Sequence, residues 1–143
     1  MSIAQDEFLL SAENILKNST GEVCIRNSIS RAYYNIYHSV TSVVKRVPEV
    51  DKNGNRLNLG VHARLIRYLE GDAYIDLSLD KKLLHKLAYS MKWTKSERED
   101  ADYHLARNIQ KLKATQIIKE AERVNAWVAV LQNEQKGNKK TGS

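Results

Sequence analysis

One long segment of the chain, residues 27–44, has the apolar spacing of a helix but almost no charge. Arg31 is its only formally charged side chain, although Asp, Glu, Lys and Arg make up 28% of the chain. At about 100° per residue, one face of this helix collects the apolar side chains Ile29, Ala32, Tyr33, Ile36, Val40 and Val43. The opposite face collects Asn27, Ser28, Arg31, Asn35, His38 and Ser42. A helix face in water normally carries Lys and Glu, which favour helix and are easily solvated. We therefore expect this helix to be covered on more than one side, either in the middle of a bundle or by a second copy of the chain.

Helical spacing recurs along the chain and predicts an all-α fold. The chain has one proline and six glycines, and no segment shows the alternation of a strand. We expect helices at residues 4–17, 22–47 and 61–70, a fourth from residue 78 and a last one from residue 114. Whether the fourth helix continues through Arg98 is open, because Thr94 and Glu97 have the spacing of a capping box. We expect one helical domain over residues 1–132, followed by a flexible basic tail over residues 133–143.

The overall charge favours a polyanionic partner. Lys and Arg number 23 against 17 Asp and Glu, a net charge of +6, and nucleic acid is the commonest polyanion in cells. Cys24 is the single cysteine, so no disulfide can form within the chain, which fits a reducing compartment. No apolar run approaches the roughly 18 residues that span a bilayer, and Asp6 and Glu7 lie where a signal peptide would be cationic. We expect a soluble, cytoplasmic protein with no membrane partner.

Two stretches carry the candidate chemistry. Arg98, Asp102, Tyr103 and His104 lie close together in the first. Arginine is a permanent, fork-shaped donor for phosphate oxygens, and histidine exchanges protons near neutral pH. Together they can cut RNA without a metal: a base removes the proton of a 2′-hydroxyl, and a cation stabilises the charge on the phosphoryl oxygens.

The second stretch places Arg31 and His38 on one helical stripe, two turns apart. The simpler interpretation is that Arg31 pairs with an acidic residue and that His38 makes an interior hydrogen bond. The alternative is that both belong to a polar site at an interface.

A metal site is not expected, because the alternation of Asp100, Asp102 and His104 would align them only on a strand, and His62 and His85 stand alone in the sequence. No Gly-rich phosphate loop and no Ser or Cys nucleophile motif occurs. We expect no cofactor.

The segment SRAYYNIYH, from Ser30 to His38, and the later segment REDADYHL, from Arg98, resemble the two signature blocks of HEPN domains, the higher eukaryote and prokaryote nucleotide-binding family. The resemblance extends from about Ala4 to Leu131. It implies an up-and-down bundle of four or five helices, commonly a homodimer with a composite cleft.

Many HEPN domains are metal-independent endoribonucleases that act in toxin–antitoxin, abortive-infection and anti-phage defence systems. They use an Arg and a His that lie a short distance apart in the chain. The resemblance therefore implies that the catalytic residues are Arg98 with His104, which we favour, and Arg31 with His38. It also implies supporting roles for Asp102, Tyr103, Tyr33 and Tyr34.

The partners that the resemblance implies are RNA and a small nucleotidyltransferase antitoxin encoded alongside. The alternative function is a non-catalytic helical module that binds RNA, a nucleotide or a partner protein. Cleavage of single-stranded RNA in EDTA separates the two.

Overall fold

The chain folds into six helices in the described residues. The computed structural model describes residues 3–18, 21–103 and 111–141. The helices are α1 (Ile3–Asn18), α2 (Glu22–Val43), α3 (Val61–Glu70), α4 (Ala73–Leu77), α5 (Lys81–Tyr103) and α6 (Lys111–Thr141). Within these ranges there is no β-strand, only an isolated bridge between Val50 and Arg56. The prediction of an all-α fold is confirmed.

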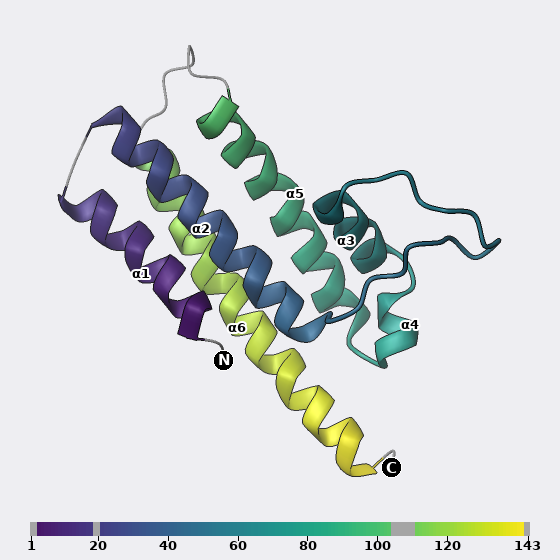
Figure 1. Cartoon of the computed structure of the whole chain (residues 1–143). Coiled ribbons are helices and arrows are strands. Elements are labelled where there is room, and N and C mark those ends of the chain that lie inside the picture. Colours follow the sequence, from purple (N-terminus) through teal and green to yellow (C-terminus); the bar gives the residue numbers. More distant parts are fainter. Residues whose placement is uncertain (1–2, 19–20, 104–110, 142–143) are drawn as a thin grey trace.

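Four long helices form the bundle, and two short ones stand beside it. Figure 1 shows α1, α2, α5 and α6 running in alternating directions, with α2 in the centre. Helix α2 packs against α1, α5 and α6, whereas α3 and α4 pack on α5. The short helices therefore lie outside the four-helix core, on the side of α5 away from α6 (Figure 1).

The interior position of α2 explains why it carries so little charge. Its apolar face is fully buried, with Ile29, Tyr33 and Ile36 all 0% exposed. Its polar face is also partly buried, since α1 covers part of it. There the Ser28 hydroxyl donates a 2.7 Å hydrogen bond to the carbonyl of Ala12 on α1. Of the two explanations that the sequence left open, burial in the middle of one bundle accounts for most of this face without a second copy.

The connection from α2 to α3 contains the turn that the sequence predicts at Asn53 and Gly54. The Asp51 carboxylate accepts hydrogen bonds from the backbone N–H groups of Asn53 and Asn55, both at 2.9 Å. Gly54 has φ +82°, a conformation that a residue with a Cβ rarely adopts. This turn folds the connection back toward α3 and α4.

Several helix boundaries differ from the sequence-based expectation, and α2 ends at Val43 rather than just before Pro48. Helix α5 begins at Lys81 rather than near Ser78, because the short helix α4 precedes it and Ser78 ends α4 in the left-handed conformation. The same helix continues through Arg98 to Tyr103, which settles the question left open by the capping-box spacing.

The end of the chain also differs from the expectation of a helical domain over residues 1–132. Helix α6 continues to Thr141, through most of the segment predicted to be a flexible basic tail over residues 133–143. The reason is a set of polar contacts that the sequence does not reveal. The Gln135 amide donates to the carbonyl of Val43 at 3.0 Å, and the Asn138 amide donates to that of Ser78 at 2.8 Å.

Candidate functional site

Aromatic, histidine and arginine side chains gather where α2 meets α1, α3 and α5. We call this group the Arg–His cluster, and its members are Phe8, Tyr33, Tyr34, Tyr37, His38, His62 and Arg98. Helix α2 supplies four of them as two pairs that are each one turn apart, Tyr33 with Tyr37 and Tyr34 with His38. The other elements each contribute one side chain to the cluster.

Arg98 is held against the rings of two tyrosines. Its guanidinium carbon lies 5.1 Å from the ring centroid of Tyr34 and 5.7 Å from that of Tyr33. A guanidinium at this distance is attracted by the ring quadrupole. The Arg98 side chain is partly buried.

His62, from the first turn of α3, joins the cluster through Tyr33 and Tyr37. A hydrogen bond links its Nδ1 to the Tyr33 hydroxyl. Its ring also stacks on that of Tyr37, with centroids 4.2 Å apart and planes within 9°. These contacts fix both the position and the orientation of the imidazole.

The surroundings set the protonation states of this pair. Burial lowers the pKa of His62, and the nearby cations Arg98 and Lys95 lower it further. Burial raises the pKa of Tyr33, while Arg98 opposes that rise. At neutral pH the imidazole of His62 is therefore neutral and the hydroxyl of Tyr33 is protonated.

His38 occupies the α1 side of the cluster. Its ring stacks on Phe8, with centroids 5.1 Å apart and planes within 5°. It meets the edge of Tyr37 at 5.5 Å. Because Tyr37 contacts both histidine rings, His38 and His62 belong to one continuous group of side chains.

The structure therefore brings together four of the residues that the sequence singles out: Arg98, His38, Tyr33 and Tyr34. Arg31 is exposed on α2 and makes no ion pair with another described residue. His104 lies outside the described residues. Asp102 and Tyr103 lie in the last turn of α5, but their side chains are outside the described part of the chain.

Two further residues were missed by the sequence-based reasoning. His62 appears isolated in the sequence, but it contacts Tyr33, which lies 29 positions away along the chain. Arg26 is 6% exposed and donates to the carbonyls of Asp100 at 3.2 Å and Ala101 at 2.8 Å. The one feature of the sequence that could have indicated a role for Arg26 is its position just before the uncharged segment. Arg26 ties the end of α5 to α2 and so positions the segment that follows Arg98.

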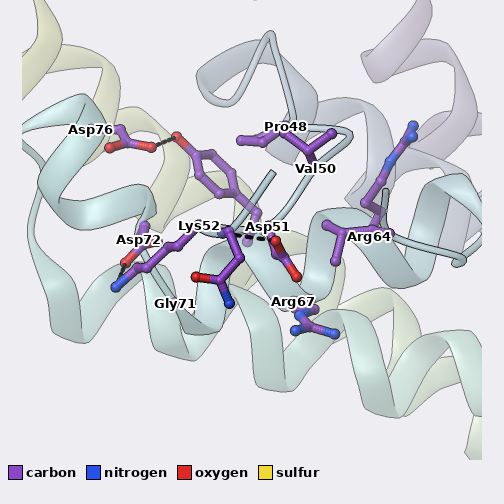
Figure 2. A pocket seen from close by; sticks show the side chains of 12 residues that line it. Pro48, Val50, Asp51, Lys52, Arg64, Arg67, Gly71, Asp72 and Asp76 are labelled. Atoms are coloured by element: carbon purple, nitrogen blue, oxygen red, sulfur yellow. Dashed lines mark hydrogen bonds and ion pairs between the residues drawn. The ribbon is translucent and has the colours of Figure 1, made fainter. Parts of the chain in front are cut away.

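A separate hollow of about 380 Å³ lies between the 48–57 connection, α3 and α4 (Figure 2). Its acidic groups are engaged within the chain. Asp72 pairs with Lys52 at 3.3 Å, and Asp76 accepts a 2.8 Å hydrogen bond from the Tyr68 hydroxyl. Figure 2 shows these two contacts beside each other along one wall. We interpret this hollow as the inner side of a connection that holds α3, and hence His62, in place.

A scan against models of protein families found no match for the chain, and a search of the curated proteins found no related sequence. No group of three His, Cys, Asp or Glu side chains suited to a metal ion occurs among the described residues. None of the described helices combines the length and apolar character needed to cross a membrane.

Proposed function

We propose that the chain is a metal-independent endoribonuclease of a toxin–antitoxin or anti-phage defence system, with the Arg–His cluster as its centre. The observation that carries the proposal is the position of Arg98. Its guanidinium lies on Tyr33 and Tyr34 and close enough to His62 to lower the pKa of that imidazole. A fixed cation beside a neutral histidine is what phosphodiester cleavage by an internal hydroxyl requires.

In the proposed reaction His62 is the base and Arg98 binds the phosphate. The proposal requires the tautomer in which the Nδ1–H of His62 donates its hydrogen bond to the Tyr33 hydroxyl oxygen, because this leaves the lone pair of Nε2 available. Nε2 takes the proton of the 2′-hydroxyl, the 2′-oxygen forms a bond to phosphorus, and the bond from phosphorus to the 5′-oxygen breaks. His38, in its protonated form, gives a proton to the departing 5′-oxygen. The products are a 2′,3′-cyclic phosphate and a 5′-hydroxyl end.

Two residues outside this core have places in the proposal. Arg31 lies on the same stripe of α2 as His38, about 10 Å along the helix axis, and is exposed. It would bind a neighbouring phosphate of the same RNA strand. His104, which the resemblance to HEPN domains favours as acid or base, is tested alongside His38 and His62. A homodimer and a nucleotidyltransferase antitoxin enter the proposal through that resemblance alone.

The test is cleavage of single-stranded RNA by the purified protein in EDTA, with the ends of the products identified. Wild type should leave 2′,3′-cyclic phosphate ends. Arg98→Ala should lower the rate by about 100-fold or more, as loss of one stabilising donor does in other enzymes. Arg67→Ala, which removes an exposed arginine of α3, is the matched control and should cut at the wild-type rate.

The histidines are separated in the same assay. His62→Gln and His38→Gln should each slow cleavage by about 100-fold or more. If only His104→Gln abolishes cleavage, the cluster is not the catalytic centre. Cleavage by Arg98→Ala at the wild-type rate would overturn the site, and wild-type protein that leaves RNA intact would overturn the proposed reaction.

One observation favours the alternative, a non-catalytic module that binds RNA, a nucleotide or a partner protein. Both histidine rings of the cluster are engaged within the chain, His38 with Phe8 and His62 with Tyr33 and Tyr37. Such contacts suit a rigid binding surface as well as a catalytic one. RNA binding that weakens steeply with salt, without any cleavage, would establish this second function.

A further inference from the structure

A groove on the outer side of the bundle, between α5 and α6, has the chemistry of a nucleic-acid site and lies apart from the Arg–His cluster. Two adjoining hollows of about 410 and 430 Å³ form it. They share Tyr89 of α5 together with Glu120 and Arg123 of α6. We call this feature the α5–α6 groove.

Three aromatic side chains line the groove: Tyr89, Trp93 and Trp127. Tyr89 is 72% exposed, so packing within the bundle does not explain why a large ring occupies this position. Tyr89 and Trp93 lie one helical turn apart on α5, and Trp127 faces them from α6. The rings therefore follow one another along the groove rather than forming a single patch.

Cations alternate with these rings. Lys82 and Lys86 of α5 and Lys119 and Arg123 of α6 line the same two hollows. Lys86 places its ammonium nitrogen 5.5 Å from the Trp127 ring centroid. From Lys82 to Trp93 the groove extends about 17 Å along the axis of α5.

The single acidic residue among the lining residues is neutralised within the chain. Glu120 is 6% exposed. Its carboxylate accepts a hydrogen bond from the Ser90 hydroxyl at 2.9 Å and pairs with Arg123 at 3.1 Å. The exposed part of the groove is therefore aromatic and positively charged.

We infer that the α5–α6 groove binds single-stranded nucleic acid. Aromatic rings stack on bases regardless of sequence, and a row of cations follows the phosphates. A second copy of the chain is a poorer occupant, because a twofold axis through the groove would place like cations against one another. The groove is on a different face of α5 from Arg98, so this inference does not rest on the proposed cleavage.

The test uses a probe that the proposed reaction cannot cut, a 2′-O-methyl oligouridylate of about 12 nucleotides, within the range that one single-strand-binding domain covers. Trp93 and Trp127 are the only tryptophans of the chain, so binding in the groove should quench the intrinsic fluorescence directly. The logarithm of the binding constant should fall with the logarithm of salt concentration, with a slope of about −2 if the three lysines of the groove contact phosphate.

Variants locate the binding. Tyr89→Ala, at an exposed position, should weaken binding by at least about fivefold, the lower end for loss of one stacked base. The double variant Lys86→Gln with Lys119→Gln should reduce the salt slope by about 1.4. The matched control, Lys45→Gln with Arg46→Gln, removes the same charge from exposed positions after α2 and should leave the slope nearly unchanged.

Two results would overturn the inference. One is that the oligonucleotide binds without quenching the tryptophan fluorescence and binds equally well to Tyr89→Ala. The other is a self-association of the chain that Tyr89→Ala disrupts while the oligonucleotide does not bind, which would assign the groove to a protein interface. The two proposals can fail separately. If wild type does not cut RNA but binds the uncleavable probe in the groove, the groove assignment stands. If Arg98→Ala abolishes cleavage but the probe does not bind in the groove, the nuclease proposal stands.

Discussion

Tyr33 shows most clearly how one residue serves both the core and the candidate site. Its ring is fully buried, which stabilises the bundle through the apolar area removed from water. Burying its hydroxyl would be unfavourable without a partner, and Nδ1 of His62 supplies that partner. The packing of α2 thus determines where the imidazole on α3 lies.

The lowered pKa of His62 makes a prediction about stability and pH. The folded chain resists protonation of this imidazole, whereas the unfolded chain takes up the proton at the ordinary pKa of 6.5. The unfolded state therefore binds more protons just below pH 6.5, and the free energy of unfolding falls as the pH drops through that range. Above the ordinary pKa both states are neutral at His62, and the effect vanishes.

Urea unfolding at about pH 7.5 and about pH 5 should show this loss in wild type. His62→Gln should have a lower free energy of unfolding than wild type at the higher pH. Its free energy of unfolding should fall less than that of wild type between the higher and the lower pH. The groups that face His62 are Tyr33, Tyr37, Arg98, Lys95, Glu99 and His38, and all are kept in the variant. An equal loss in both proteins would mean that other groups cause the pH dependence.

The sequence predicts the residues of the cluster only as far as local spacing allows. Tyr34 and His38 are four positions apart on one helix, so their common side follows from the periodicity, whereas the periodicity places Tyr33 on the apolar face. Arg98 was identified through its resemblance to a family block. His62 could not be found in this way, because the contact with Tyr33 depends on how the long 44–60 connection returns α3 to the bundle.

At the scale of elements, the sequence predicts the interior of the bundle better than the helix ends. Apolar periodicity depends on burial, and the low charge of α2 correctly predicts that this helix is covered on more than one side. Helix ends depend on polar contacts between elements that are distant in sequence. The Gly, Asn and Lys residues after Leu131 resemble a solvated tail, yet they continue α6 alongside the ends of α2 and α4.

Truncation tests the role of this extension. Deletion of residues 133–143 removes the Gln135 and Asn138 contacts and that of Glu134, which accepts a 3.1 Å hydrogen bond from the backbone N–H of Asp80. At roughly 0.5–1.5 kcal/mol for each of the three hydrogen bonds, the free energy of unfolding should fall by about 1.5–4.5 kcal/mol. Deletion of residues 139–143 keeps these contacts and should change it by less than about 0.5 kcal/mol. Equal effects in urea titrations would show that the contacts do not stabilise the fold.

Arg26 provides a second test at the scale of elements. Its buried guanidinium donates to two carbonyls near the end of α5, where the helix dipole favours a cation. Arg26→Met keeps the apolar stem but removes these bonds, so the free energy of unfolding should fall by about 2–3 kcal/mol.

Arg31→Met is the matched control for Arg26→Met, because it removes an exposed arginine from the same helix. It should change the free energy of unfolding by less than about 0.5 kcal/mol. Thermal and urea unfolding measure both variants. If the two substitutions cost the same, the contacts of Arg26 with α5 do not hold the two helices together.

For the whole molecule, burial of α2 by α1, α5 and α6 has a consequence for the site. The resemblance to HEPN domains implies a composite cleft between two copies, and the low charge of α2 left open whether a second copy covers this helix. One chain supplies most of that cover, and it also brings Arg98, His38 and His62 into one cluster. A nuclease site built from these residues would therefore be complete in each chain, whether or not the chain forms a dimer.

Mixing two inactive variants distinguishes a complete site from a composite one. If the cluster is the centre, Arg98→Ala and His62→Gln lie in the same site, so each chain of a mixed dimer carries one defect and no intact site exists. If Arg98 of one copy instead acts with His62 of the other, a mixed dimer holds one site with both residues intact. We expect no RNA cleavage after the two proteins are unfolded together and refolded, with sedimentation recording whether dimers form. Recovery of activity toward about a quarter of the wild-type rate would assign the reaction to a cleft between copies, because half of the dimers would be mixed and each would hold one intact site of two.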